Sequence, residues 1–141
     1  MRKPSRLIVS LVMIAFSVAI VACGGMNMMM SNRQLQSITV SPSSADAMNF
    51  PAGTVHFMAT GTYTVAPMNG TPPVLWSLGN PFSTQPTPMG VSINANGLAQ
   101  CSGFMGMITV EATAPMDPSM PLSQMSMNSM NVTGMAQLTC P

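Results

Sequence analysis

The chain from Leu35 onward consists of short runs in which hydrophobic and polar residues alternate, separated by Pro, Gly and Asn. This part has no long segment with helical periodicity, and the 13 Pro residues of the chain disfavour one. Instead, seven runs have the length and residue types of β-strands. They cover residues 35–41, 55–64, 74–77, 91–93, 98–102, 107–112 and 132–139. The pattern predicts an all-β domain of about seven strands, built as a sandwich or a barrel.

The alternation within these runs indicates which side chains form the core. In residues 55–64, one face is apolar throughout, and the other carries His56, Met58 and three Thr. The apolar face is expected to turn inward with Val55, Phe57, Ala59, Gly61 and Tyr63. Trp76, the only Trp, is also expected to pack in the core, which leaves Phe82 and Phe104 in turns as the aromatic candidates for surface contact.

Two further alternations assign side chains to faces. In residues 35–41, Leu35 falls on the opposite phase from Ile38 and Val40. Glu111 alternates outward from its apolar neighbours, so we expect it to be solvated. The long segment 113–131 is rich in Pro and Met and is expected to form a mobile loop.

The first 22 residues have the pattern of a secretory signal peptide. Arg2, Lys3 and Arg6 form a basic start, and an apolar run from Leu7 to Ala22 follows. At roughly 16 residues, the run is shorter than the roughly 20 that span a bilayer comfortably. A membrane anchor that stays uncleaved is the alternative.

The end of this segment, Ile20-Val21-Ala22-Cys23, resembles the lipobox of bacterial lipoproteins. The resemblance implies that Cys23 receives a diacylglycerol, that the chain is cut before it, and that the new amino terminus is acylated. The family often has Leu where Ile20 stands. The implied location is outside the cytoplasm, anchored by lipid in the bacterial cell membrane or outer membrane. Several acyl chains anchor a protein stably, whereas one does so only marginally.

Residues 23–34 are expected to form a flexible tether, and residues 35–141 the domain. The chain has three Cys. If Cys23 carries lipid, Cys101 and Cys140 remain, and export makes a disulfide between them plausible. Two buried free thiols are the alternative.

Several motifs of the domain resemble bacterial Ig-like domains of group 2. They are LQSITVSP, FMATGTYT, VLWS, INANGLAQC and ITVEATA, which fall on successive predicted strands. The resemblance covers residues 35–140, extends to small exported acidobacterial lipoproteins, and implies an immunoglobulin-like β-sandwich. It also implies a structural or adhesive role at the cell envelope, in contact with a surface polymer or another envelope protein. The Cys pair that joins the sheets of antibody-type domains is absent at its usual strands.

Charge excludes several classes of function. The chain has four Lys or Arg and three Asp or Glu, and from Cys23 onward one Arg stands against three acidic residues. Without a basic patch, nucleic-acid binding is not expected. An enzyme is not expected either, because His56 would have to act with Asp46 or Asp117 and no nucleophile elbow is present. The acidic residues are spread singly, which disfavours a calcium site.

Methionine is the unusual component, with 18 residues in the chain. We expect no cofactor, because Met also fills neutral positions without a dedicated role. The alternative is Cu(I) binding by thioethers, or oxidant buffering by the same side chains. The candidate Cu(I) ligands are Met105, Met107, Met125, Met127 and Met130.

Overall fold

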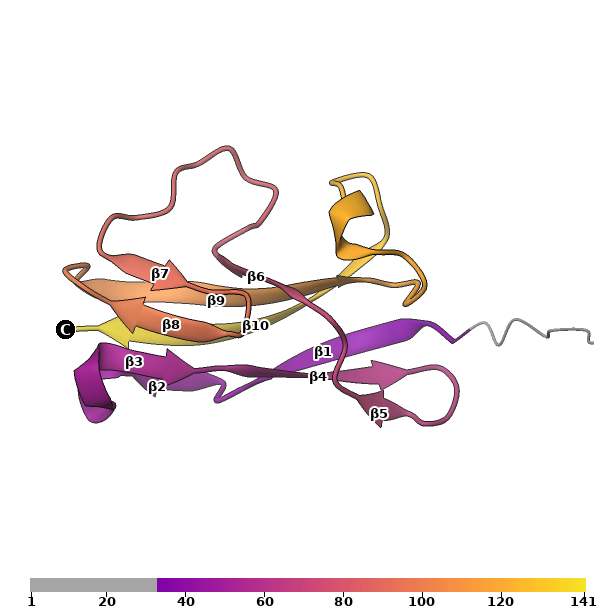
Figure 1. Cartoon of the computed structure of the whole chain (residues 1–141), viewed down its shortest axis with the longest axis horizontal. Coiled ribbons are helices and arrows are strands. Elements are labelled where there is room, and N and C mark those ends of the chain that lie inside the picture. The colour runs from indigo at the N-terminus through magenta and orange to yellow at the C-terminus, as the bar shows by residue number, and fades with distance from the viewer. Residues whose placement is uncertain (1–32) are drawn as a thin grey trace, which may run out of the picture. The chain divides into compact units, whose positions relative to one another are not determined.

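The computed structural model describes residues 33–141, and these are almost entirely strands and loops (Figure 1). The strands are β1 (Leu35–Ser41), β2 (Ser44–Asp46), β3 (Thr54–His56), β4 (Met58–Tyr63), β5 (Asn69–Gly70), β6 (Leu75–Leu78), β7 (Val91–Ile93), β8 (Leu98–Cys101), β9 (Gly106–Pro115) and β10 (Asn131–Cys140). Three single-turn 3-10 helices join them, namely η2 (Ala47–Asn49), η3 (Pro51–Gly53) and η4 (Leu122–Gln124). The signal peptide 1–22, Cys23 and the tether up to residue 32 lie outside the described residues.

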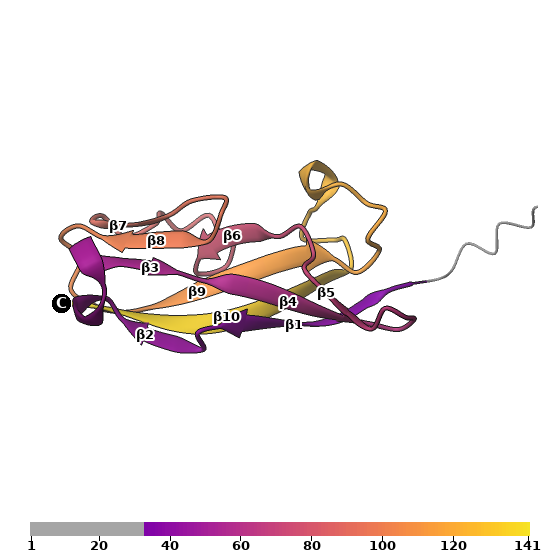
Figure 2. The same cartoon turned by 60° about the horizontal axis from the view of Figure 1, so that its bottom comes forward.

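The strands form two layers. One is the sheet β2-β10-β9-β6, in which β2 runs parallel to β10 and the other pairs are antiparallel. The other consists of β1-β4-β5 and β3-β8-β7, which are linked because β3 and β4 form one continuous run with only Phe57 between them (Figures 1 and 2). The predicted all-β sandwich is confirmed. In the part of the chain that is described, no helix is long and apolar enough to cross a membrane.

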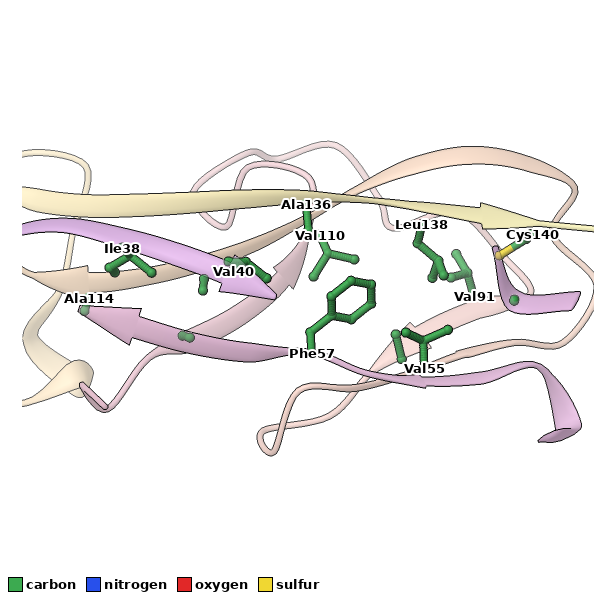
Figure 3. Close-up of a cluster of buried hydrophobic side chains, with 14 of the residues drawn as sticks. Ile38, Val40, Val55, Phe57, Val91, Val110, Ala114, Ala136, Leu138 and Cys140 are labelled. Atoms are coloured by element: carbon green, nitrogen blue, oxygen red, sulfur yellow. The ribbon is translucent and has the colours of Figure 1, made fainter. Parts of the chain in front are cut away.

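The predicted apolar face of residues 55–64 is the centre of the core. Phe57 is 1% exposed, and its ring points from the β3–β4 junction toward Val110 of β9 (Figure 3). Val55, Ala59, Gly61 and Tyr63 are buried on the same face. Every buried side chain of the core comes from a strand or from Ala47 of η2 and Phe57 at the junction. The period-two pattern therefore places this run correctly.

The predicted strand boundaries hold within three residues, and two runs, 35–41 and 91–93, match β1 and β7. Two strands were not predicted, β2 with the sequence SAD and β5 with the sequence NG. Neither has an apolar alternation of its own. They form because neighbouring strands supply backbone partners. β2, which contains Ala45, pairs with β10, and β5, which contains Gly70, pairs with β4.

The expectation that Leu35 faces away from Ile38 and Val40 is wrong. All three are buried, at 1%, 8% and 3% exposure. The register of β1 against β4 shifts between Leu35 and Ser37, so that one extra residue is inserted in β1. Such a bulge reverses the alternation and brings both parts of the strand to the core face.

Arg33 and Gln34, the last residues of the predicted tether, are fixed to the domain. The Arg33 guanidinium lies 3.6 Å from the centroid of the Tyr63 ring, and its Nη2 donates to the Pro67 carbonyl at 2.8 Å. The Gln34 N–H donates to Thr64 Oγ1, and the Thr64 N–H donates to the Gln34 carbonyl. A cation over an aromatic face contributes roughly 0.5–2 kcal/mol. The described chain thus enters β1 along a defined path.

Cys101 and Cys140 form a disulfide, with their Cα atoms 5.7 Å apart. The bond joins β8 of one layer to β10 of the other. It therefore links the two layers, as the Cys pair of antibody-type domains does, but from other strands.

We expect the double substitution Cys101→Ala, Cys140→Ala to cost on the order of 4 kcal/mol, because the disulfide closes a long loop and restricts the unfolded chain. The sequence separation of the two residues is 39. Urea unfolding of the two proteins at pH 7 measures the difference. A loss below about 1 kcal/mol would mean that the bond contributes little beyond the packing of the layers.

The expectation that Glu111 is solvated is wrong, since only 8% of it is exposed. β9 lies between β10 and β6, and Glu111 is flanked by Met135 on one side and Ser77 on the other. Burial raises the pKa of the Glu111 carboxyl above its ordinary value of 4.5. The folded protein therefore holds this proton more tightly than the unfolded chain does, so ionisation of Glu111 lowers stability as pH rises above that value.

We expect Glu111→Gln to melt at a higher temperature than the natural chain at pH 7, and at the same temperature below about pH 4. Thermal unfolding followed by circular dichroism across this range measures the effect. Asp117→Asn is the matched control, because Asp117 is exposed and hydrogen bonds from Ser119 lower its pKa. It should give no gain at pH 7. A Glu111→Gln difference that does not change with pH would contradict the assignment to ionisation.

Candidate functional site

The layer that contains β3 and β4 has a gap at its centre. The Phe57 N–H donates to the Gly97 carbonyl at 2.8 Å, which continues the pairing of β3 with β8. Further along, Gly61 pairs with Gly70 of β5. Alternate residues of a strand present their peptide groups to the same edge, so the peptide groups of Ala59 point toward this edge as well, between the two pairings. On this side of the sheet, Ala59 therefore has no strand partner among the described residues, although only 5% of the residue is exposed.

A groove of about 740 Å³ lies at this gap. Ala59, Phe57 and the β6 residue Trp76 contribute to its apolar lining, and Leu122 of η4 contributes from another part of the chain. The remaining lining residues are Ser41, His56, Met58, Thr60, Thr71, Pro72, Pro73, Val74, Ala95 and Asn96. None of the described charged residues lines it, so the groove presents apolar surface and hydrogen-bonding groups.

Two Pro residues explain why the chain does not fill this gap itself. The segment Thr71–Val74 leads from β5 to β6 and lines the groove. Pro72 and Pro73 have no N–H and cannot donate hydrogen bonds to the edge of β4. The chain therefore passes the open edge here without adding a strand to it.

The turn that joins β7 to β8 forms the opposite wall. Asn94 Oδ1 accepts hydrogen bonds from the N–H groups of Asn96 and Leu98, at 2.9 and 3.0 Å. Gly97 has a φ of +78°, as its Asn-Gly sequence predicts. A Cβ atom at Gly97 would collide with the Phe57 carbonyl and lie 3.0 Å from the Trp76 ring. Glycine therefore allows the turn to pack closely over Trp76.

Trp76 is only partly enclosed. It packs against the buried cluster, as predicted for a core residue, but it also lines the groove and a smaller hollow of about 390 Å³ under the loop 79–90. Phe104, expected at the surface, is half-buried against the core, and Phe82 is half-buried in the loop. The strand pattern gives no signal for the groove, because the gap depends on where β5 and β8 end.

His56 and Met58 lie next to the open edge. Both point to the outer face, as their strand phase predicts, and Met58 is 60% exposed. The Nε2 atom of His56 lies 3.1 Å from the backbone carbonyl oxygen of Asn96. This hydrogen bond holds the imidazole against the β7–β8 turn, which forms one wall of the groove.

The five Met residues predicted as Cu(I) ligands fall into two separate groups. Met105 and Met107 lie at the start of β9, while Met125, Met127 and Met130 lie in the segment between β9 and β10, beyond the other end of that strand. β9 has 10 residues and so is roughly 33 Å long. The two groups cannot bind one ion together. The connecting segment is also shorter than expected, because β9 and β10 extend into residues 113–131.

The predicted disulfide residues are joined, as described above, and Cys23 lies outside the described residues. Asp46 and Asp117, the possible catalytic partners of His56, instead accept hydrogen bonds within local turns. Asp46 Oδ1 accepts from the Met48 N–H at 3.0 Å, and Asp117 Oδ1 accepts from the N–H and hydroxyl of Ser119 at 2.9 and 2.7 Å. Within residues 33–141, no group of three or more His, Cys, Asp or Glu side chains is placed to hold a metal ion.

No protein-family model matches the chain, and a search of curated proteins gives no significant match. The groove at the gap, with an open peptide edge at Ala59 and His56 and Met58 beside it, is the candidate site that the geometry provides.

Proposed function

We propose that the chain is an exported lipoprotein, anchored at the cell envelope through lipid on Cys23, whose single Ig-like module of the group 2 kind has a structural or adhesive role. In this proposal the module binds an extended segment of another envelope protein in the groove. The observation that carries the proposal is that, in the described part of the chain, the edge of β4 has no strand partner at Ala59, where it lines a groove with apolar walls.

The disulfide supports export. Bonds of this kind form and persist in oxidising compartments outside the cytoplasm. Cys101 and Cys140 come from the ends of β8 and β10 and meet at an ordinary Cα separation. Their pairing agrees with the signal peptide predicted for residues 1–22.

The groove supports the binding of an extended peptide. A strand edge offers hydrogen bonds to the backbone of a partner, and adjacent pockets receive its side chains. Here the peptide groups of Ala59 supply the edge, and Trp76, Pro72 and Val74 supply apolar contact. Since no described charge lines the groove, we expect binding to depend little on salt concentration.

The test uses a photo-crosslinking amino acid placed singly in the full chain and expressed in its native host. At Thr71, which lines the groove, we expect a crosslink to an envelope protein. At Thr39, which pairs with Thr60 but lies outside the groove, we expect none. A second substitution, Thr60→Arg, should remove the Thr71 crosslink by filling the groove, and Thr39→Arg is the matched control.

A Thr71 crosslink that survives Thr60→Arg, or one that glycan hydrolases digest and proteases do not, would exclude a protein partner in the groove.

The anchor is tested in the same cells with an alkyne-labelled fatty acid. The natural chain should take up the label and Cys23→Ser should not. The crosslinking and labelling experiments can fail independently, because labelling of Cys23 does not depend on the groove.

A second candidate function is oxidant buffering, and one observation favours it. None of the 12 Met residues between positions 33 and 141 is buried. Nine have exposed fractions from 55% at Met68 to 93% at Met89, and Met116, Met120 and Met125 are half-buried. Each thioether can take the oxygen of hypochlorous acid to give a sulfoxide, releasing chloride and a proton. The core has no Met to lose by this reaction.

We expect hypochlorous acid to add one oxygen to each of the exposed Met side chains while the domain stays folded. The melting temperature should fall by less than about 4–8 °C, the shift that roughly 1 kcal/mol causes in a domain of this size. Mass spectrometry and circular dichroism on one sample measure both. A variant with Leu at the nine exposed positions should consume less oxidant before Trp76 reacts. Loss of cooperative unfolding on oxidation would contradict this function.

A further inference from the structure

We propose that the edge of the groove holds a Cu(I) site, in which the His56 Nδ1 atom and the Met58 thioether are the protein ligands. This pair differs from the Met residues that the sequence pattern indicates, and it does not depend on the function proposed above. It follows from the tautomer of His56, from the position of both residues on one strand run, and from the disulfide that joins Cys101 to Cys140.

The hydrogen bond of His56 determines which ring nitrogen is free. Its Nε2 atom lies 3.1 Å from the Asn96 carbonyl oxygen, and a carbonyl oxygen only accepts. Nε2 must therefore carry the hydrogen, and the neutral ring has its lone pair on Nδ1. Histidines that bind metals usually donate their second nitrogen to a carbonyl or carboxylate in this way, which fixes the ring. The hydrogen bond to Asn96 gives His56 this arrangement.

Met58 is the nearest thioether on the same face of the strand run. Residues two apart in a strand lie roughly 7 Å apart and point to the same side. Both side chains face outward and both line the groove, while Phe57 between them is buried and anchors the backbone. The long, flexible Met side chain can bring its sulfur toward Nδ1 without moving the strand.

The ligand types select a soft ion. Thioether sulfur and imidazole nitrogen suit Cu(I), and hard cations such as Mg²⁺ or Ca²⁺ require oxygen ligands. His56 is the only His of the chain. Cys101 and Cys140 are bonded to each other, so within the described residues no thiol competes for the ion. The pair is thus the place where nitrogen and sulfur ligands can act together.

Trp76 gives the site its own reporter. It is the only Trp of the chain and lines the same groove as His56 and Met58. A cation near an indole interacts with its π face and changes its fluorescence. Met105, Met107, Met127 and Met130 do not line this groove, so ions bound by them should leave the Trp76 signal unchanged.

The experiment titrates the full chain in detergent, with free thiols alkylated and the disulfide intact. The probes are Ag(I), which does not change oxidation state, and Cu(I) under a competing chelator. We expect both to change Trp76 fluorescence to saturation at one equivalent. Met58→Leu and His56→Asn should each weaken this first equivalent by at least roughly 10- to 100-fold, the size of effect seen when even indirect contacts to a metal are removed. Both residues face solvent, so the variants should melt like the natural chain.

The double variant Met127→Leu, Met130→Leu is the matched control, because it removes two exposed thioethers outside the groove. It should keep the fluorescence change and its stoichiometry. The proposal is overturned if Met58→Leu or His56→Asn leaves the titration unchanged. It is also overturned if the double variant abolishes the signal, or if the change never saturates.

Discussion

The fold depends on a change of partner at Phe57. The run from Thr54 to Tyr63 pairs with β8 in its first part and with β1 and β5 in its second. Phe57 lies at the point where the partner changes. Its ring is in the core, and its N–H donates a hydrogen bond to the Gly97 carbonyl. Burying a Phe side chain contributes roughly 1.5–3 kcal/mol, enough to hold the run in place while its partners differ on either side. The same change creates the gap, because neither β8 nor β5 reaches Ala59.

The positions of the His56 imidazole and the Met58 thioether also depend on Phe57. Since the side chain of Phe57 points inward, His56 and Met58 point outward, and the backbone hydrogen bond to Gly97 brings His56 next to Asn96. The groove, the open edge and the imidazole are therefore parts of one arrangement. A change in the register of this run by one residue would exchange the two faces and remove all three.

The sequence predicts what is local. The period-two pattern identifies the buried face of residues 55–64, and Asn96-Gly97 identifies a turn with positive φ. It does not predict the bulge at Leu35, which follows from the register of β1 against β4. Nor does it predict the burial of Glu111, which depends on β10 and β6 on either side. The pattern does not predict the groove for the same reason, because strand ends that are far apart in sequence define it.

The path of the chain at Arg33 determines how the domain responds to a mechanical pull. A pull on Arg33 directed along the axis of β1 would first meet the contacts of Arg33 with Tyr63 and Pro67 and would then enter the strand at Leu35. The hydrogen bonds between β1 and β4 lie across that axis, because antiparallel bonds are perpendicular to the strands. A pull in this direction loads the bonds of the pair in shear, all together, whereas pulling the strands apart from one end would break them in turn. A module tied down at this end and gripped at the groove beside β4 would bear force in its more resistant direction.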